Sequence, residues 1–260
     1  MPKSSLGQHF LFDPNLMDRI VKSAGNLNNS TIIEIGPGPG GLTRALLESP
    51  AHSIIAIEQD LRFKPVLELL KQKYPNKFDF ILDDALKINL QTLGQEPRLI
   101  IANLPYNIAT ILLINWLDYI RSFSQLILMF QKEVADRLVA KPGSKAYGRL
   151  SILVQWLADV DDIFDIAPGS FFPPPKVYST VVRLTPLSEP RFKANPYTLQ
   201  NLTKTVFGQR RKMIRHSLRG LTNDAQSILH QANIAETLRP EDLTLEQFCT
   251  LANLLDKEKN

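Results

Sequence analysis

The stretch TIIEIGPGPGGLT, from Thr31 to Thr43, predicts the fold class of this 260-residue chain. An apolar run that ends at Ile35 is typical of a buried strand, and four glycines lie in the six residues that follow it. The sequence behind the glycines has the apolar spacing of a helix. Strand, glycine loop and helix in this order form the nucleotide-binding corner of a doubly wound α/β sheet. Because glycine lets a backbone approach a ligand closely and a helix N-terminus offers free N–H groups, we expect a cofactor at Gly36.

Two features of this corner bear on which ligand it binds. Three of its glycines fit the G-x-G-x-x-G pattern of nicotinamide enzymes, and Glu58 ends the next apolar run, 22 residues after Gly36, where a carboxylate suits the hydroxyls of a ribose. Pro37 and Pro39, however, remove two N–H donors that a pyrophosphate would need. The residues therefore favour S-adenosylmethionine, which has no phosphates, over a nicotinamide dinucleotide. A tight turn without a ligand remains the alternative.

The composition is that of an ordinary globular protein, with 44% hydrophobic and 22% charged residues. No apolar run approaches the roughly 20 residues of a membrane span, so we expect no membrane association. The N-terminus lacks the apolar core of a signal peptide. The single cysteine, Cys249, cannot form an internal disulfide. These features predict a cytoplasmic protein.

Apolar strands and amphipathic helices alternate along the first two thirds of the chain. We expect strands at 31–35, 53–58, 78–82, 98–102 and 125–130, and helices at 14–24, 41–49, 61–73, 108–120, 131–139 and 150–158. Such alternation predicts a mostly parallel sheet with both faces covered. Two further strands around the proline-rich corner in 160–184 are expected to close the sheet as an antiparallel edge.

The strand pattern ends at a linker over 188–196. Beyond it, helices are expected near 197–207, 211–219, 223–233 and 241–255. We therefore predict two domains, an α/β domain over residues 1–188 and a small all-α domain over residues 189–260.

Polar or glycine residues stand at four successive strand ends, namely Gly36, Glu58, Asp84 and Asn103. Ligands bind at the carboxyl ends of the strands in sheets of this type. We therefore expect these four residues to share one cleft. No His/Cys cluster has the spacing of a metal site, so we expect no metal.

The tetrapeptide NLPY, Asn103 to Tyr106, suits the methylation of an amine on a base. An exocyclic adenine amine is a poor nucleophile because its lone pair is delocalised into the ring. Hydrogen bonds from its N–H groups to the Asn103 side chain and to the backbone carbonyls of Leu104 and Pro105 would localise that lone pair. Tyr106 offers a ring on which the base stacks, and catalysis then requires only placement beside the methyl donor. The alternative is a turn with Tyr106 in the core.

A second aromatic residue, Phe171, precedes three prolines in FFPPPKV. The prolines stiffen the segment, and Phe171 presented on it would stack on an extruded adenine. The alternative is that Phe171 and Phe172 only fill the edge of the sheet.

The charge is concentrated near the C-terminus. Residues 191–260 carry 11 basic against seven acidic side chains, which accounts for the net charge of +4. Six basic residues and no acidic one lie between positions 204 and 219: Lys204, Arg210, Arg211, Lys212, Arg215 and Arg219. This cluster predicts a surface for a polyanionic partner such as a nucleic acid, with a solvated helix face as the alternative.

Taken in order, several motifs resemble those of the ribosomal RNA adenine dimethyltransferases, most closely the branch that modifies the small subunit. They are GQHFL, EIGPGPGGLT, the Glu58 strand end, Asp84-Ala85, NLPYNI, FFPPPKVYSTVVRL and GQRRKMIRHSL. The resemblance covers essentially the whole chain. It implies a Rossmann-like, class I methyltransferase sheet for the first domain and an rRNA-binding role for the helical one.

The resemblance also implies roles for individual residues. Those implied to contact S-adenosylmethionine are His9, Leu11, Gly36, Glu58, Asp84 and Asn103. Tyr106 and Phe171 would sandwich the target base. The family more often has Asn at the position of His9, so a backbone contact there would survive, whereas a side-chain contact need not.

The implied reaction transfers two methyl groups to N6 of each of two adjacent adenosines in the 3′-terminal hairpin loop of 16S rRNA. The implied substrate is an assembling small ribosomal subunit, and we expect the protein to act as a monomer. One alternative is a 23S rRNA adenine N6-methyltransferase of the macrolide-resistance type, which often has isoleucine at the position of Leu104. Another is a ribosome assembly factor that keeps the fold without catalysis. NLPY and the C-terminal domain favour the first interpretation.

Overall fold

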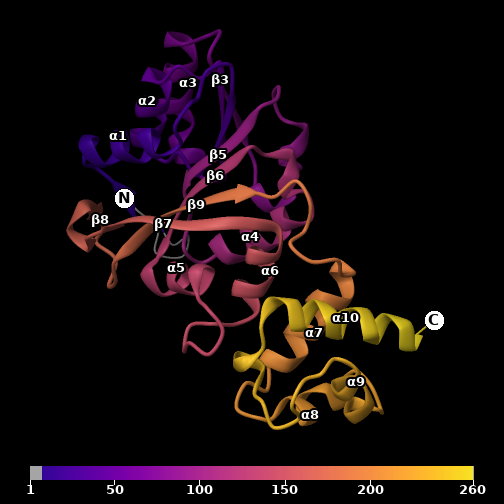
Figure 1. Ribbon diagram of the computed structural model, residues 1–260. Coiled ribbons are helices and arrows are strands. Elements are labelled where there is room, and N and C mark those ends of the chain that lie inside the picture. Colours follow the sequence, from indigo (N-terminus) through magenta and orange to yellow (C-terminus); the bar gives the residue numbers. More distant parts are fainter. Residues whose placement is uncertain (1–7, 260) are drawn as a thin grey trace. The chain divides into compact units, whose positions relative to one another are not determined.

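The computed structural model describes residues 8–259 and contains a central, mostly parallel sheet (Figure 1). Within that range the sheet has seven strands: β2 (Thr31–Ile35), β3 (Ser53–Glu58), β4 (Phe78–Leu82), β5 (Arg98–Asn103), β6 (Gln125–Gln131), β7 (Ala158–Ile166) and β9 (Ser179–Pro186). Their order is β4-β3-β2-β5-β6-β9-β7. The chain thus has the predicted α/β sheet.

The core of the sheet is β2, which pairs in parallel with β3 and β5. All five of its residues are buried, because neighbouring strands and helices cover it on every side. This environment explains the uninterrupted apolar run in the sequence. Glu34 is the one charged residue of the strand and is only 1% exposed.

Helices connect the strands of this part of the chain. They are α1 (Pro14–Ser23), α2 (Gly41–Glu48), α3 (Lys64–Lys73), α4 (Ala109–Leu117), α5 (Lys132–Val139) and α6 (Arg149–Leu157). The first of them begins where the sequence predicts. The Asp13 side chain accepts from the backbone N–H of Asn15 at 2.9 Å, and Pro14 occupies the first helical position.

The predicted antiparallel edge is present. β9 runs antiparallel to β6, with Leu126 opposite Leu184, and lies between β6 and β7. A second, two-stranded sheet joins β1 (Phe10–Leu11) to β8 (Phe171–Phe172), with Phe10 opposite Phe172. The sequence analysis missed this pair, because two residues are too few to show a strand period.

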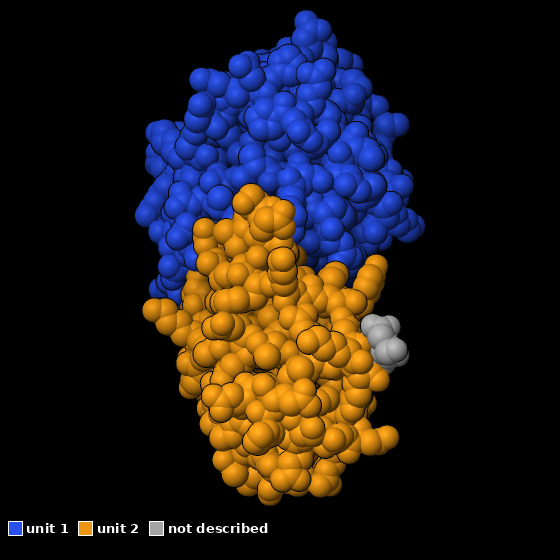
Figure 2. All heavy atoms as spheres, turned by 45° about the vertical axis from the view of Figure 1, so that its right-hand side comes forward, with its two compact units in different colours: residues 1–135, 160–186 blue, residues 136–159, 187–260 orange. Residues whose placement is uncertain are grey.

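The chain divides into two compact units, coloured separately in Figure 2. One comprises Met1–Ala135 and Val160–Pro186, and the other Asp136–Asp159 and Leu187–Asn260. The second unit contains α7 (Pro196–Phe207), α8 (Ile214–Ser217), α9 (Ala225–Gln231) and α10 (Leu245–Lys259). It also includes α6, which is fixed there by the bond from Trp156 Nε1 to the Phe192 carbonyl at 2.7 Å.

Two helices of the second unit, α8 and α9, are shorter than predicted, whereas α7 matches the expected range to within one residue and α10 is displaced towards the C-terminus. α8 begins at Ile214, whereas we expected a helix from residue 211, because the preceding residues turn back and the Lys212 N–H bonds to the Gln209 carbonyl at 2.8 Å. Among the helices described, none is long and apolar enough to cross a membrane.

Candidate active site

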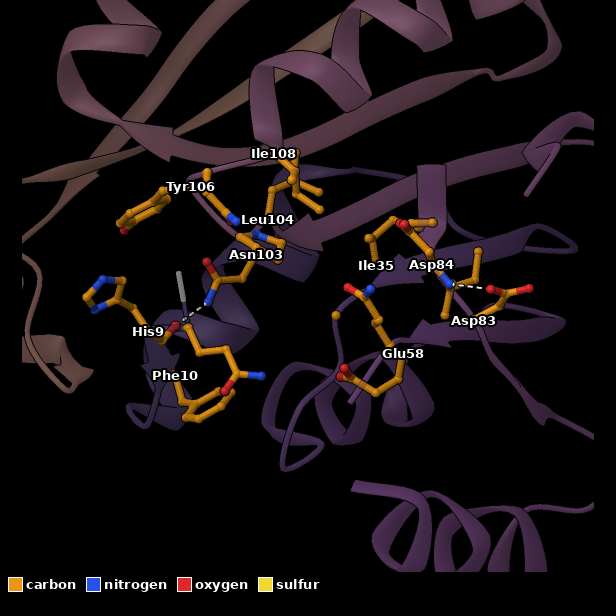
Figure 3. Close-up of a pocket in the computed structure, with 17 residues that line it drawn as sticks. His9, Phe10, Ile35, Glu58, Asp83, Asp84, Asn103, Leu104, Tyr106 and Ile108 are labelled. Carbon is orange, nitrogen blue, oxygen red and sulfur yellow. Dashed lines mark hydrogen bonds between the residues drawn. The ribbon is translucent and has the colours of Figure 1, made fainter. Parts of the chain in front are cut away.

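A pocket opens at the carboxyl ends of the central strands (Figure 3). The chain turns into it after β2, β3, β4 and β5, and β1 borders it as well. The predicted site residues that line it are His9, Gly36, Glu58, Asp84, Asn103, Leu104, Pro105 and Tyr106. The four strand-end residues therefore do share one cleft. His9 and Tyr106 lie at one end of it, and Glu58 and Asp84 lie towards the other.

Two glycines of the loop have positive φ angles, a conformation that other residues rarely adopt. Gly36 has a φ of +71°, and a β-carbon added there would lie 3.7 Å from the Pro105 ring. At Gly38, whose φ is +54°, an added β-carbon would lie 2.7 Å from the ring of Phe10, which is too close for any side chain. The close approach of the loop to Phe10 of β1 thus requires glycine at position 38, whereas at Gly36 the positive φ is what favours glycine.

Two backbone N–H groups hold the carboxylate of Glu58. Its Oε2 accepts from the N–H of Gly38 at 2.9 Å, and its Oε1 accepts from the N–H of Asp60 at 2.8 Å. Burial raises the pKa of Glu58, and these backbone N–H groups oppose that rise. The Arg62 guanidinium holds the pKa of the neighbouring Asp60 well below its usual value. A carboxylate accepts about four hydrogen bonds, so Glu58 keeps acceptor capacity for hydroxyl groups in the pocket.

Asp84 lies farther along the same wall and is half-buried. Its Oδ1 accepts from the N–H of Leu86 at 3.0 Å, which fixes the side chain at the start of a short 3-10 turn. The Asp84 N–H itself bonds to Asp83 Oδ1 at 2.7 Å. The second oxygen of Asp84 suits a donor such as an adenine amine.

The orientation of Asn103 is fixed by the N-terminal segment. Its Nδ2 donates to the backbone carbonyl of His9 at 2.9 Å, so that its Oδ1 remains as an acceptor (Figure 3). The Leu104 carbonyl has no hydrogen-bond partner among the residues described. One prediction needs correction here: the Pro105 carbonyl is not a free acceptor, because it already accepts from the N–H groups of Ile108 and Ala109 at 3.1 and 3.0 Å, at the start of α4.

Tyr106 is fixed at its hydroxyl and covered on its ring. The hydroxyl bonds to Ser179 Oγ in β9, and the imidazole of His9 stacks on the ring with centroids 5.2 Å apart and an interplanar angle of 27°. The His9 ring is held in turn by a 2.7 Å bond from its Nδ1 to the Pro173 carbonyl. Tyr106 therefore lines the pocket and is not a core residue.

Two predicted site residues lie outside this pocket. Leu11, 6% exposed, lines a smaller neighbouring cavity that also touches Gly36 and Asn103. Phe171 is 4% exposed and packs in the core opposite Leu11, whereas Phe172 is 58% exposed. Successive residues of a strand point to opposite sides, so only one of the two phenylalanines reaches solvent. Contrary to our expectation, this structure does not present Phe171 to a base.

The sequence analysis missed Glu34, which lines the same smaller cavity as Leu11. Its Oε2 accepts from the Thr43 hydroxyl of α2 at 2.7 Å. Burial raises the pKa of Glu34 to about 8. The signal was a single charged residue inside an otherwise apolar strand, since a carboxyl is rarely buried without a specific reason.

The predicted RNA-binding residues lie in the helical unit and fall into two groups. Arg210 is ion-paired with Glu241, and Arg215 lies 3.6 Å from a carboxylate oxygen of Glu236. The others are exposed and form no ion pair with any residue that the structure describes: Lys204, Arg211, Lys212 and Arg219.

Comparison with known proteins assigns this arrangement to a family. The model of the family described as ribosomal RNA adenine dimethylase matches residues 2–257. The ribosomal RNA small subunit methyltransferase A of Rhodospirillum rubrum is 50% identical over 254 residues, covering 98% of this chain and 88% of that protein. The protein of the same name from Ehrlichia ruminantium is 47% identical, covering 98% of this chain and 97% of its own.

Solved structures share the fold. A dimethyladenosine transferase from Plasmodium falciparum superposes with a TM-score of 0.80 at 26% identity, covering 96% of this chain and 98% of that one. The 23S rRNA methyltransferase ErmE has a TM-score of 0.70 at 24% identity, covering 95% and 99% of the two chains. From the extent of the family match and the identity to these relatives, the chain belongs to the ribosomal RNA adenine dimethylase family.

Proposed function

We propose that this protein transfers methyl groups from S-adenosylmethionine to N6 of two adjacent adenosines in the 3′-terminal hairpin loop of 16S rRNA. Family membership supports the reaction class, and the names of the two relatives above support the small subunit as the substrate. Each transfer replaces one hydrogen of the amine by a methyl group, so that two transfers complete each adenosine.

The pocket fits the cofactor by its shape and its donor set. Gly36 lines the pocket without a side chain and has a φ of +71°, as expected where a ligand passes close to the backbone. Glu58 would hold the ribose hydroxyls and Asp84 the adenine amine, while Gly36 would lie under the methionine part. When bound, S-adenosylmethionine supplies an electrophilic methyl group on its sulfonium sulfur.

The residues of NLPY hold the amine that is methylated. Asn103 Oδ1 and the Leu104 carbonyl are the two acceptors available for the two hydrogens of an adenine N6 amine. Bonds to both hydrogens localise the nitrogen lone pair, so no strong base is required. Tyr106, fixed at its hydroxyl by Ser179, supplies a ring for stacking.

The observation that carries this proposal is the hydrogen bond from Asn103 Nδ2 to the His9 carbonyl. Without it, the side-chain amide could present its NH₂ group to the base and would repel an amine. With it, the amide is held with its acceptor available, as catalysis by positioning requires.

The helical unit supplies the contacts to RNA outside the pocket. The exposed cations Arg211 and Lys212 suit phosphates around the hairpin, and single-stranded loops are the usual targets of proteins that stack unpaired bases. We place the protein in the cytoplasm, where it acts on assembling small subunits as a monomer that needs no metal.

The test compares two acceptors. Small subunits from cells lacking the modification and unmodified large subunits are each incubated with the protein and methyl-labelled cofactor. We expect label in the small subunits and at most background label in the large ones. Label confined to large subunits would favour the 23S alternative, and label in neither, with RNA binding retained, would favour a non-catalytic assembly factor.

A further inference from the structure

The ring of Tyr106 is already stacked in the free protein. The His9 imidazole covers it with centroids 5.2 Å apart and the planes inclined by 27°, within the range of favourable offset stacking. Both residues are half-buried and line the same pocket, at the end nearest Asn103 in Figure 3. A base that stacks on this face of Tyr106 must take the place that the imidazole occupies.

The backbone and the ring of His9 are held by separate bonds. Its carbonyl accepts from Asn103 Nδ2 at 2.9 Å, whereas its ring makes the 2.7 Å bond to the Pro173 carbonyl. Because a carbonyl oxygen only accepts, Nδ1 carries the proton of that bond. Rotation about the side-chain bonds, with loss of the bond to the Pro173 carbonyl, therefore moves the ring off Tyr106 while the backbone contact that orients Asn103 stays in place.

The two other aromatic side chains considered for base stacking, those of Tyr106 and Phe171, are fixed in place. Tyr106 is tied at its hydroxyl to Ser179 of β9, and Phe171 is 4% exposed in the core. Of these three aromatic side chains, the imidazole is the one that can be displaced by breaking only its hydrogen bond to the Pro173 carbonyl. We infer that His9 acts as a placeholder: its ring occupies the stacking face of Tyr106 in the free protein, and the target adenine displaces it.

This inference rests on the proposed function and makes His9 a positioning residue that lowers the apparent affinity for the base. Only the fraction of molecules with the ring displaced is competent to stack a base, and the measured Kd equals the intrinsic Kd divided by that fraction. A stacked aromatic pair has the strength for an effect of about 3- to 10-fold.

The experiment measures base stacking without methyl transfer. Small subunits carry 2-aminopurine at the two target positions of the 3′ hairpin, where it stacks but lacks the N6 amine, and its fluorescence reports binding. We expect His9→Ala and His9→Asn to tighten binding about 3- to 10-fold and His9→Phe, which keeps a ring, not to tighten it. The matched control is His52→Ala, which removes an exposed histidine at the start of β3.

Two further measurements separate the possible failures. Circular dichroism should show that His9→Ala is folded like the wild type. In a Tyr106→Leu background, His9→Ala should not change the affinity for the base, because the ring for which the imidazole and the base compete is then absent. Weaker or unchanged binding by His9→Ala, with Tyr106→Leu impaired, would overturn the placeholder while leaving the proposed function intact. If Tyr106→Leu binds as well as wild type, base stacking at this site is wrong altogether.

Discussion

The backbone N–H of Gly38 donates to Oε2 of Glu58 at 2.9 Å, and this bond joins the glycine loop to the end of the neighbouring strand β3. The Asp60 N–H holds the other oxygen of the same carboxylate at 2.8 Å. In the proposed function, this one buried side chain both shapes the loop and offers acceptors to a ribose, so that cofactor binding and loop conformation are coupled through Glu58.

From this coupling we expect Glu58→Ala to weaken binding of S-adenosylmethionine about 10- to 100-fold, since hydrogen bonds to charged groups contribute about 1.5–3 kcal/mol each. Calorimetry gives the affinity, and circular dichroism checks the fold. Glu68→Ala is the control, because Glu68 forms only an exposed ion pair with Lys64 on α3. An unchanged affinity in Glu58→Ala would remove Glu58 from the cofactor site.

Asn103 is predicted to act on the chemical step. Asn103→Ala should lower the single-turnover rate of methyl transfer by about 10²- to 10³-fold, the usual cost of losing one positioned group, while RNA affinity changes little. Asn103→Asp keeps oxygen acceptors but loses the donor to the His9 carbonyl. Its rate of methyl transfer, compared with that of the wild type, therefore measures how much the fixed orientation of the side chain contributes. Near-normal transfer by Asn103→Ala would refute the mechanism.

The basic residues should differ in what they contribute. The double change Arg211→Ala and Lys212→Ala should weaken RNA binding and reduce the slope of log affinity against log salt by about one per cation. Arg210→Ala, next in the sequence, should mainly lower the melting temperature, because Arg210 is paired with Glu241 and bonds to the Ser144 carbonyl. Equal effects of the two changes on the salt slope would show that this grouping is wrong.

Glu34 predicts a pH dependence of stability. Its pKa is raised from 4.5 to about 8 in the folded protein, so the native state holds a proton that the unfolded chain releases. Between these values the unfolded state binds fewer protons, and stability falls as pH rises, with a slope approaching about 1.4 kcal/mol per pH unit. Glu34→Gln removes this loss. Urea unfolding at pH 5.5 and 8.5 gives the free energy of unfolding of the variant minus that of the wild type, and we expect this difference to be larger at pH 8.5. A difference that does not change with pH would contradict the assignment.

The sequence predicts the central strands β2, β5 and β6 well because they are buried on both faces. The short apolar run that ends at Ile35 indicates a buried central strand, and in the structure β2 spans the predicted residues. The position of the pocket was predicted because Gly36, Glu58, Asp84 and Asn103 lie at or just beyond the carboxyl ends of parallel strands, and all four line the pocket. Periodicity and the geometry of parallel sheets suffice for these features.

What the sequence did not reveal depends on contacts between distant segments. The β1–β8 pair joins residues about 160 positions apart through strands of two residues, and it decides that Phe171 faces the core while Phe172 faces solvent. Whether the Pro105 carbonyl is free to accept a hydrogen bond from a base depends on the residue at which α4 begins. The stacking of His9 on Tyr106 likewise requires the fold to be known.

The most direct test of the central claim is the identity of the nucleoside that the protein makes. Small subunits lacking the modification are incubated with the protein and methyl-labelled S-adenosylmethionine, and the RNA is digested and analysed by mass spectrometry. We expect N6,N6-dimethyladenosine at both adjacent positions of the 3′-terminal hairpin, and therefore four methyl groups per RNA. Label on any other nucleoside, or no label with an intact cofactor site, would contradict the account.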